Sequence, residues 1–164
     1  MRIREASLED LEEIREINLE AFRRIPSVGF DGMRDKRDLK HFIKHEDFRV
    51  YVAEEDKIIG FAIMRVKNIN RRFRFDRLER PPIEDRESYA YIMYIAVKPD
   101  YQGRGIGKLL MKKLIEEAKL LGKRGIFGEF TEASPAAIKI AESFGGQRLS
   151  ADIWYKFDFR VFKK

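Results

Sequence analysis

The sequence predicts a single α/β (mixed α+β) domain in which a mixed sheet carries helices on both faces. Strand-like runs interleave with amphipathic helical runs in the order β-α-α-β-β-β-α-β-α-β. The chain has 164 residues and an apolar fraction of 44%, which suffices for one sizeable core. No repeat or linker divides the sequence. One domain over residues 1–164 is therefore expected.

The first half of the chain is expected to form one strand, two helices and a hairpin. The segment "RIREA" predicts the first strand, and Ser7 with Asp10 predicts a capping box at the start of a helix. Leu8 and Leu11 begin the apolar face of that helix. A shorter helix is expected from Lys36 to Lys44. The two apolar runs of "FRVYVAEEDKIIGFAIMRV" predict a hairpin around a polar turn.

The second half is expected to alternate strands and helices. The aromatic and β-branched run "YAYIMYIAV" predicts a central strand that ends before Pro99. After a glycine-rich turn, an amphipathic helix continues until Gly122. The run "GIFGEF" predicts a short strand, and Ser134 with Pro135 predicts the start of the last helix. The tail "RLSADIWYKFDFRVF" alternates as one or two closing strands.

Composition narrows the function classes. The absence of cysteine excludes disulfides, a thiol nucleophile and a Cys-ligated zinc site. The N-terminus has no apolar core typical of a signal peptide, and no apolar run reaches membrane length. We therefore expect a cytoplasmic protein without membrane contact. His41 and His45 lie four residues apart on a predicted helix, but no third ligand motif accompanies them, so no metal is expected.

Positive charge is concentrated in one segment. From Arg65 to Arg80 there are seven Lys/Arg and two Asp/Glu, which accounts for most of the net charge of +6. The basic insert, residues 68–88, interleaves arginines with Phe73 and Phe75. That pattern fits a nucleic-acid clamp, a substrate lid that recognises an acidic substrate, or a charged sheet edge that blocks aggregation. We rank the edge or lid first and do not expect nucleic acid as a partner.

The turn after the central strand, "YQGRGIGKLL", is typical of phosphate binding. Amides at a helix N-terminus attract anions, and glycine lets the ligand approach closely. A nucleotide P-loop does not fit, because Gly103 to Gly107 is one residue too short and Leu109 replaces its hydroxyl residue. The dinucleotide fingerprint does not fit either, because it requires glycine where Lys108 stands.

The turn matches the pattern Q/R-x-x-G-x-G/A, and at this point the sequence resembles the GNAT superfamily of acyl-CoA N-acyltransferases. The resemblance covers nearly the whole chain, with "YIAVKPDYQGRGIGKLLMKKLIEEA" as a close local match. It implies a GNAT-like fold with a mostly antiparallel sheet, and acetyl-CoA as cosubstrate. It also implies that backbone groups of Ile95, Ala96 and Val97 pair with the pantetheine arm. The residues expected to bind the pyrophosphate are Gln102, Gly103, Arg104, Gly105, Ile106, Gly107 and Lys108.

The last predicted helix departs from the family pattern N-x-x-A-x-x-x-Y-x-x-x-G-F. Alignment on Ala137 and Gly145 places Ser134, Ala141 and Gly146 at the Asn, Tyr and Phe positions. The tyrosine that usually protonates the leaving thiolate is therefore absent. Losing a general acid costs about 10²–10⁴-fold where it matters. A thiol with a pKa of about 8.5 remains a fair leaving group without one.

Two residues are candidates for the proton transfers. Glu129, at the end of the strand "GIFGEF", is the expected base, ahead of Glu132. Tyr94 on the central strand is the expected substitute acid, with Tyr91 as the alternative. Ordinary strand packing is the competing interpretation for both tyrosines, and an exposed strand-end carboxylate for Glu129. Met93 occupies a position where many relatives carry a carboxylate.

The expected function is N-acetyl transfer from acetyl-CoA to a primary amine of a small molecule or peptide. The absence of cysteine favours direct attack in a ternary complex. One alternative is a non-catalytic acyl-CoA-binding or regulatory module, and another is nucleic-acid binding through the Arg-rich segment. The sequence leaves open the acceptor and whether the protein forms a homodimer.

Overall fold

The fold is built on a mixed, mostly antiparallel sheet, as predicted. The computed structural model describes residues 1–24, 36–67, 86–129, 135–149 and 154–159. Within them, seven strands pair in the order β1-β2-β3-β4-β5-β7-β6. Only β4 and β5 are parallel, and the other neighbours are antiparallel. The strands are β1 (Arg2–Glu5), β2 (Phe48–Glu54), β3 (Ile58–Arg65), β4 (Tyr89–Val97), β5 (Gly125–Glu129), β6 (Gln147–Leu149) and β7 (Trp154–Asp158).

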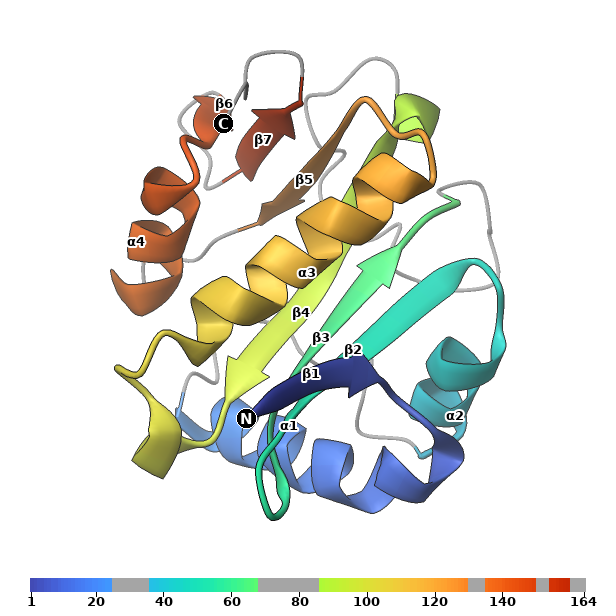
Figure 1. The fold of residues 1–164 in the computed structure, drawn as a ribbon, viewed down its shortest axis with the longest axis vertical. Coiled ribbons are helices and arrows are strands. Elements are labelled where there is room, and N and C mark those ends of the chain that lie inside the picture. The colour runs from blue at the N-terminus through green and yellow to red at the C-terminus, as the bar shows by residue number, and fades with distance from the viewer. Residues whose placement is uncertain (25–35, 68–85, 130–134, 150–153, 160–164) are drawn as a thin grey trace.

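Helices cover both faces of this sheet. The helices are α1 (Leu11–Arg24), α2 (Lys36–Lys44), α3 (Ile106–Leu120) and α4 (Pro135–Ser143). Figure 1 shows α3 running across the front of the sheet, with α4 beside it. One core packs α3 and α4 against the sheet through residues such as Leu110 and Ala141, and a second packs α1 and α2 through Ile14 and Phe42.

The structure settles one detail of the sequence prediction and corrects another. The tail, predicted as one or two closing strands, forms two, because Gln147 to Leu149 pairs with β7 as an antiparallel strand. In addition, Leu8 does not join the apolar face of α1. It lies in a 3-10 turn, η1 (Leu8–Asp10), and is 41% exposed.

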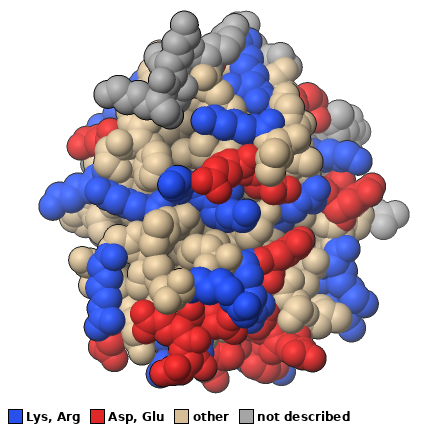
Figure 2. Space-filling view, in the orientation of Figure 1, with Lys and Arg blue, Asp and Glu red and all other residues tan. Residues whose placement is uncertain are grey.

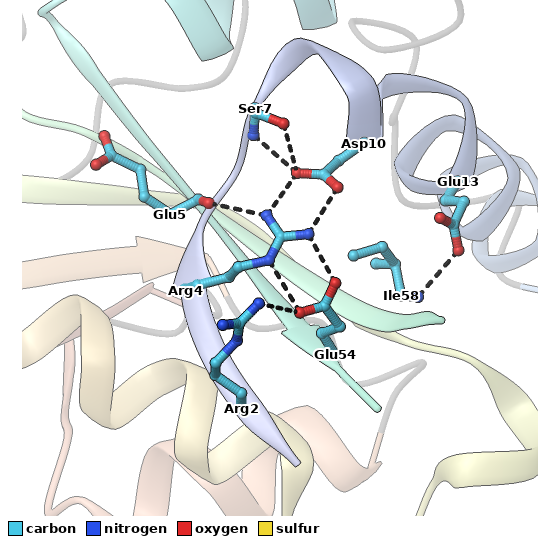
Figure 3. Close-up of polar contacts among 8 residues, drawn as sticks. All are labelled: Arg2, Arg4, Glu5, Ser7, Asp10, Glu13, Glu54 and Ile58. Carbon is cyan, nitrogen blue, oxygen red and sulfur yellow. Dashed lines mark hydrogen bonds and ion pairs between the residues drawn. The ribbon is translucent and has the colours of Figure 1, made fainter. Parts of the chain in front are cut away.

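Charged side chains fix the turn that enters α1 (Figure 3). Asp10 accepts a hydrogen bond from the Ser7 N–H at 2.8 Å, as the predicted capping box requires. Arg4 donates to both carboxylate oxygens of Asp10 at 2.8 Å and to Glu54 at 2.9 Å. These contacts lower the pKa of Asp10 and lower that of Glu54 to about 2. The network thereby joins β1, the α1 entry and β2.

The described surface carries both signs of charge. Figure 2 shows acidic side chains gathered at the lower edge and Lys and Arg across the middle, where Figure 1 places α3. Most of the basic insert, residues 68–85, lies outside the described residues. None of the described helices is long and apolar enough to cross a bilayer.

Candidate active site

Strand β4 changes its pairing halfway along its length. Its first residues, Tyr89 to Ile92, pair in parallel with β5. At Met93 the register with β3 shifts, because Ile92 and Tyr94 oppose consecutive residues of β3. Met93 is thus the extra residue of a β-bulge, a feature that bends a strand locally. Beyond Ile92, none of the described strands pairs with the β5-side edge of β4.

The open part of this edge has backbone groups suited to an extended ligand. The Lys98 N–H donates to the Ile59 carbonyl of β3 at 2.8 Å. Because an antiparallel ladder alternates its hydrogen-bonded residues, Ala96 also directs its backbone groups toward β3. Ile95 and Val97 direct theirs toward the open side. A ligand containing amides can therefore pair with this edge as an additional strand would.

The glycine-rich turn brings the start of α3 close to this edge. A short 3-10 turn, η5 (Pro99–Tyr101), leads into it. Gly103 and Gly105 have left-handed φ values of 80° and 79°, and a Cβ built at either would meet no atom within 4 Å. The Leu109 N–H donates to the Gly105 carbonyl at 3.1 Å, so the amides of residues 106–108 come before the first intrahelical N–H donor.

The start of α3 is not neutralised by its own cap or by its own first turn. The N-cap, Gly105, has no side-chain cap, and the first turn of α3 contains no acidic residue. Arg104 and Lys108 are exposed beside it. Their charges add to the positive end of the helix dipole, which favours a bound anion. The predicted pyrophosphate residues thus form one turn in which Arg104 and Lys108 are exposed and Ile106 is buried.

Two side chains link the turn to its surroundings. The Arg104 guanidinium lies over the Tyr101 ring, 4.9 Å from its centroid. The Gln102 Nε2 donates to the Val97 carbonyl at 3.2 Å. Gln102 was predicted to bind through its backbone, whereas Tyr101 was not among the predicted binding residues. Sequence spacing alone does not predict this contact, because it depends on the path of the folded turn.

The proposed catalytic residues do not form a described cluster. Tyr94 is 7% exposed and packs in the core between the sheet and α1 and α2. Glu129 is the last residue of β5 and pairs with Trp154, but its side chain lies outside the described part, as does Glu132. Tyr91 stacks on Phe127 with ring centroids 5.1 Å apart. Acid and base therefore remain predictions.

Helix α4 has no phenol where the family pattern has one. Ala141 is fully buried against the sheet, and Ser134 lies outside the described residues. A Cβ built on Gly107 would lie 2.9 Å from Ile140 Cδ1, so the start of α3 packs closely against α4.

The histidine pair does not form part of a metal site in the described residues. His41 and His45 stack with ring centroids 4.7 Å apart. No group of three or more His, Cys, Asp or Glu suited to holding a metal occurs in the described ranges.

Known proteins share this architecture. A structure of YncA, a putative acetyltransferase from Salmonella typhimurium with acetyl-CoA, superposes with a TM-score of 0.77 at 18% identity and covers 99% of this chain and 96% of its own. The PaiA N-acetyltransferase of Thermoplasma acidophilum, solved with coenzyme A, gives a TM-score of 0.73 at 17% identity, covering 96% of this chain and 98% of its own. At these identities the likeness shows the fold.

Sequence comparison is more specific. An uncharacterised N-acetyltransferase of Methanocaldococcus jannaschii is 33% identical over 129 residues, which is 74% of this chain and 50% of that protein. The chain thus spans about half the length of that relative. The acetyltransferase (GNAT) family model matches residues 11–145, which includes β4, the glycine turn and α3. The chain belongs to the acetyltransferase (GNAT) family.

Proposed function

We propose that the protein transfers an acetyl group from acetyl-CoA to a primary amine of a small molecule or peptide. The observation that carries the proposal is the uncapped, glycine-flanked start of α3 beside the open edge of β4. This combination offers anion-binding amides and a row of strand-pairing groups to one ligand. Acetyl-CoA has both matching parts, a pyrophosphate and an arm with two amides.

In the proposed complex the pyrophosphate lies on the amides from Gln102 to Lys108, and the pantetheine arm pairs with Ile95 to Val97. The thioester then reaches the bulge region of β4. N–H groups on the open edge can polarise its carbonyl, which stabilises the oxyanion formed during attack. The arm enters along the same edge that β5 leaves free.

The amine nitrogen attacks the thioester carbon, and the carbon–sulfur bond breaks. The amine loses its proton to a base, for which Glu129 is our candidate. The departing thiolate has an ordinary pKa of about 8.5 and needs no dedicated acid. That property suits a chain in which Ala141 stands where relatives have tyrosine and Tyr94 is buried in the core.

The direct test measures thiol release from acetyl-CoA with a panel of amines, amino acids and peptides, and identifies acetylated products by mass. We expect release that depends on one class of amine. Tight acetyl-CoA binding without turnover on any acceptor would instead indicate a binding module. Nucleic-acid affinity that falls with salt and survives Gly105→Glu would instead indicate a nucleic-acid-binding protein that uses the basic insert.

The base assignment has its own test. We expect Glu129→Gln to lower kcat by about 10²–10³-fold, a loss that shrinks at high pH, where the amine deprotonates unaided. Glu116→Gln, an exposed α3 substitution with the same charge change, serves as the control. Unchanged kcat in Glu129→Gln would remove this residue from the mechanism.

A further inference from the structure

The side chain of Arg104 has an unusual setting for an exposed arginine. It stands between Gly103 and Gly105, both of which have left-handed backbone and open space where a Cβ would lie. Arg104 is therefore the one side chain rising from this three-residue stretch. Its guanidinium lies over the Tyr101 ring, 4.9 Å from the centroid.

Tyr101 itself is anchored. It is half-buried and packs at the margin of the α3 and α4 core. Its N–H donates to the Lys98 carbonyl at 2.9 Å, which closes η5. A ring fixed in this way restricts the rotamers of the arginine above it. Fewer rotamers are then lost when the guanidinium binds a ligand.

We propose that Tyr101 is a positioning residue that holds Arg104 over the start of α3, where the guanidinium binds a phosphate of coenzyme A. The inference rests on the proposed function, because it requires that coenzyme A binds this turn. Arginine suits the role, since its planar fork can stack on an aromatic face and bind phosphate at the same time. Tyr101 would contribute without touching the ligand.

The test is a double-mutant cycle read by calorimetric titration of coenzyme A at low and at high salt. Arg104→Ala should weaken binding about tenfold at low salt, because one charge-assisted contact is lost. Tyr101→Leu should weaken it about threefold. Tyr101→Phe, which keeps the ring, should bind within twofold of the wild type. In the Arg104→Ala background, Tyr101→Leu should have no further effect.

A shape-matched variant keeps the test valid if Tyr101→Leu disturbs folding. A trifluorinated phenylalanine at position 101 retains the ring but withdraws the electron density that attracts the cation. We expect it to reproduce the loss seen in Tyr101→Leu, with the apo melting temperature unchanged. Lys119→Ala is the matched control, since Lys119 lies over the Phe159 ring at 5.3 Å near the opposite end of α3. It should bind coenzyme A normally.

The outcomes separate the two levels of inference. Additive losses from Tyr101→Leu and Arg104→Ala, or full affinity in the fluorinated variant, would overturn the role of Tyr101 while leaving the proposed function intact. A loss that persists unchanged at high salt would also contradict it, because a charge contact is screened. A wild-type protein that does not bind coenzyme A at all would remove both proposals.

Discussion

Two helical segments of this protein begin in opposite ways. At the entry to α1 the N-cap is Ser7, and Asp10 three residues later returns its carboxylate to the Ser7 N–H. At the entry to α3 the N-cap is Gly105, and the residue three positions later is Lys108. The first end is neutralised within the chain. The second keeps its positive potential and its free amides.

This difference separates a structural helix start from a binding helix start. Internal capping stabilises a helix by about 1 kcal/mol, and an acidic residue in the first turn adds several tenths. The α3 entry lacks both contributions and replaces them with glycines and cations. A bound anion would supply the missing cap and negative charge. Ligand binding should therefore stabilise the fold through the α3 entry and not through the α1 entry.

The largest effect should follow from closing the α3 entry. Gly105→Glu places a side chain at φ 79° and a carboxylate where the phosphates would bind. We expect coenzyme A affinity to fall more than a hundredfold, from repulsion combined with loss of the loop geometry. Calorimetric titration measures the affinity.

The control for backbone strain lies at the other end of α3. Gly122 has φ 73°, and a Cβ built there would also meet no atom within 4 Å. Gly122→Glu should therefore cost comparable stability and leave coenzyme A binding within twofold. Equal losses of affinity in the two variants would show that strain, not the anion site, explains the first result.

Making the α3 entry resemble the α1 entry should have the next largest effect. Lys108→Glu introduces an acidic residue at the position that Asp10 holds before α1. We expect coenzyme A affinity to fall by about 2 kcal/mol, or roughly thirtyfold. The apo protein should gain about 0.3–1 kcal/mol of stability from the helix dipole, visible as a melting temperature higher by roughly 1–3 °C.

Lys112→Glu is the matched control, since Lys112 is exposed one turn further along α3. It makes the same change in net charge but lies beyond the free amides. A stabilised apo protein with unchanged coenzyme A affinity in Lys108→Glu would contradict the phosphate role of this helix end.

The sequence predicted helices and strands correctly where the apolar pattern was continuous and its two ends were well defined. The helix predicted from Lys36 to Lys44 and the strand "YAYIMYIAV" have the predicted bounds. Leu8 was misplaced because its spacing from Leu11 matches a helix, although the capped turn before α1 is a 3-10 turn that exposes it. The bulge at Met93 could not be predicted, since an extra residue leaves an aromatic and β-branched run unchanged in appearance.

For the candidate site, the sequence predicted a glycine-rich turn at the start of a helix, and the structure has that turn, with left-handed φ values at Gly103 and Gly105. Coenzyme A binding at this turn stays a prediction. Side-chain contacts that depend on that path, such as Arg104 over Tyr101, follow from the folded turn and not from spacing. The proton-transfer residues were chosen by position along a strand, which does not specify burial; Tyr94 lies in a core.

A smaller effect is expected from opening the α1 entry. Asp10→Ala removes the carboxylate that binds both the Ser7 N–H and Arg4. We expect the free energy of unfolding to fall by about 1.5 kcal/mol, measured by urea denaturation, because a cap and a charge-assisted contact are lost while Arg4 keeps Glu54.

The same variant should bind coenzyme A with wild-type affinity, which is the point of the comparison. Glu9→Gln, in the same turn but exposed, should change stability by only a few tenths of a kcal/mol. A loss of coenzyme A affinity in Asp10→Ala beyond twofold would mean that the two helix entries are coupled and that their separation into structural and binding roles is wrong.

The smallest effect should appear in how the stability of the fold decreases at acid pH. The Arg4 and Arg2 contacts lower the pKa of Glu54 from 4.5 to about 2, and the Arg4 contact lowers that of Asp10. A carboxyl group whose pKa is lower in the folded state stabilises the fold above its unfolded pKa and loses that contribution as pH falls through the folded value. Between pH 5 and about 2, urea midpoints should therefore decline less steeply for Glu54→Gln than for the wild type.

Glu55→Gln, at the exposed neighbouring position, should follow the wild-type slope. Parallel slopes for all three proteins would show that the ion pairs of Glu54 with Arg2 and Arg4 do not persist in solution, and the internal neutralisation of that helix start would then rest on Ser7, Asp10 and the Arg4–Asp10 pair.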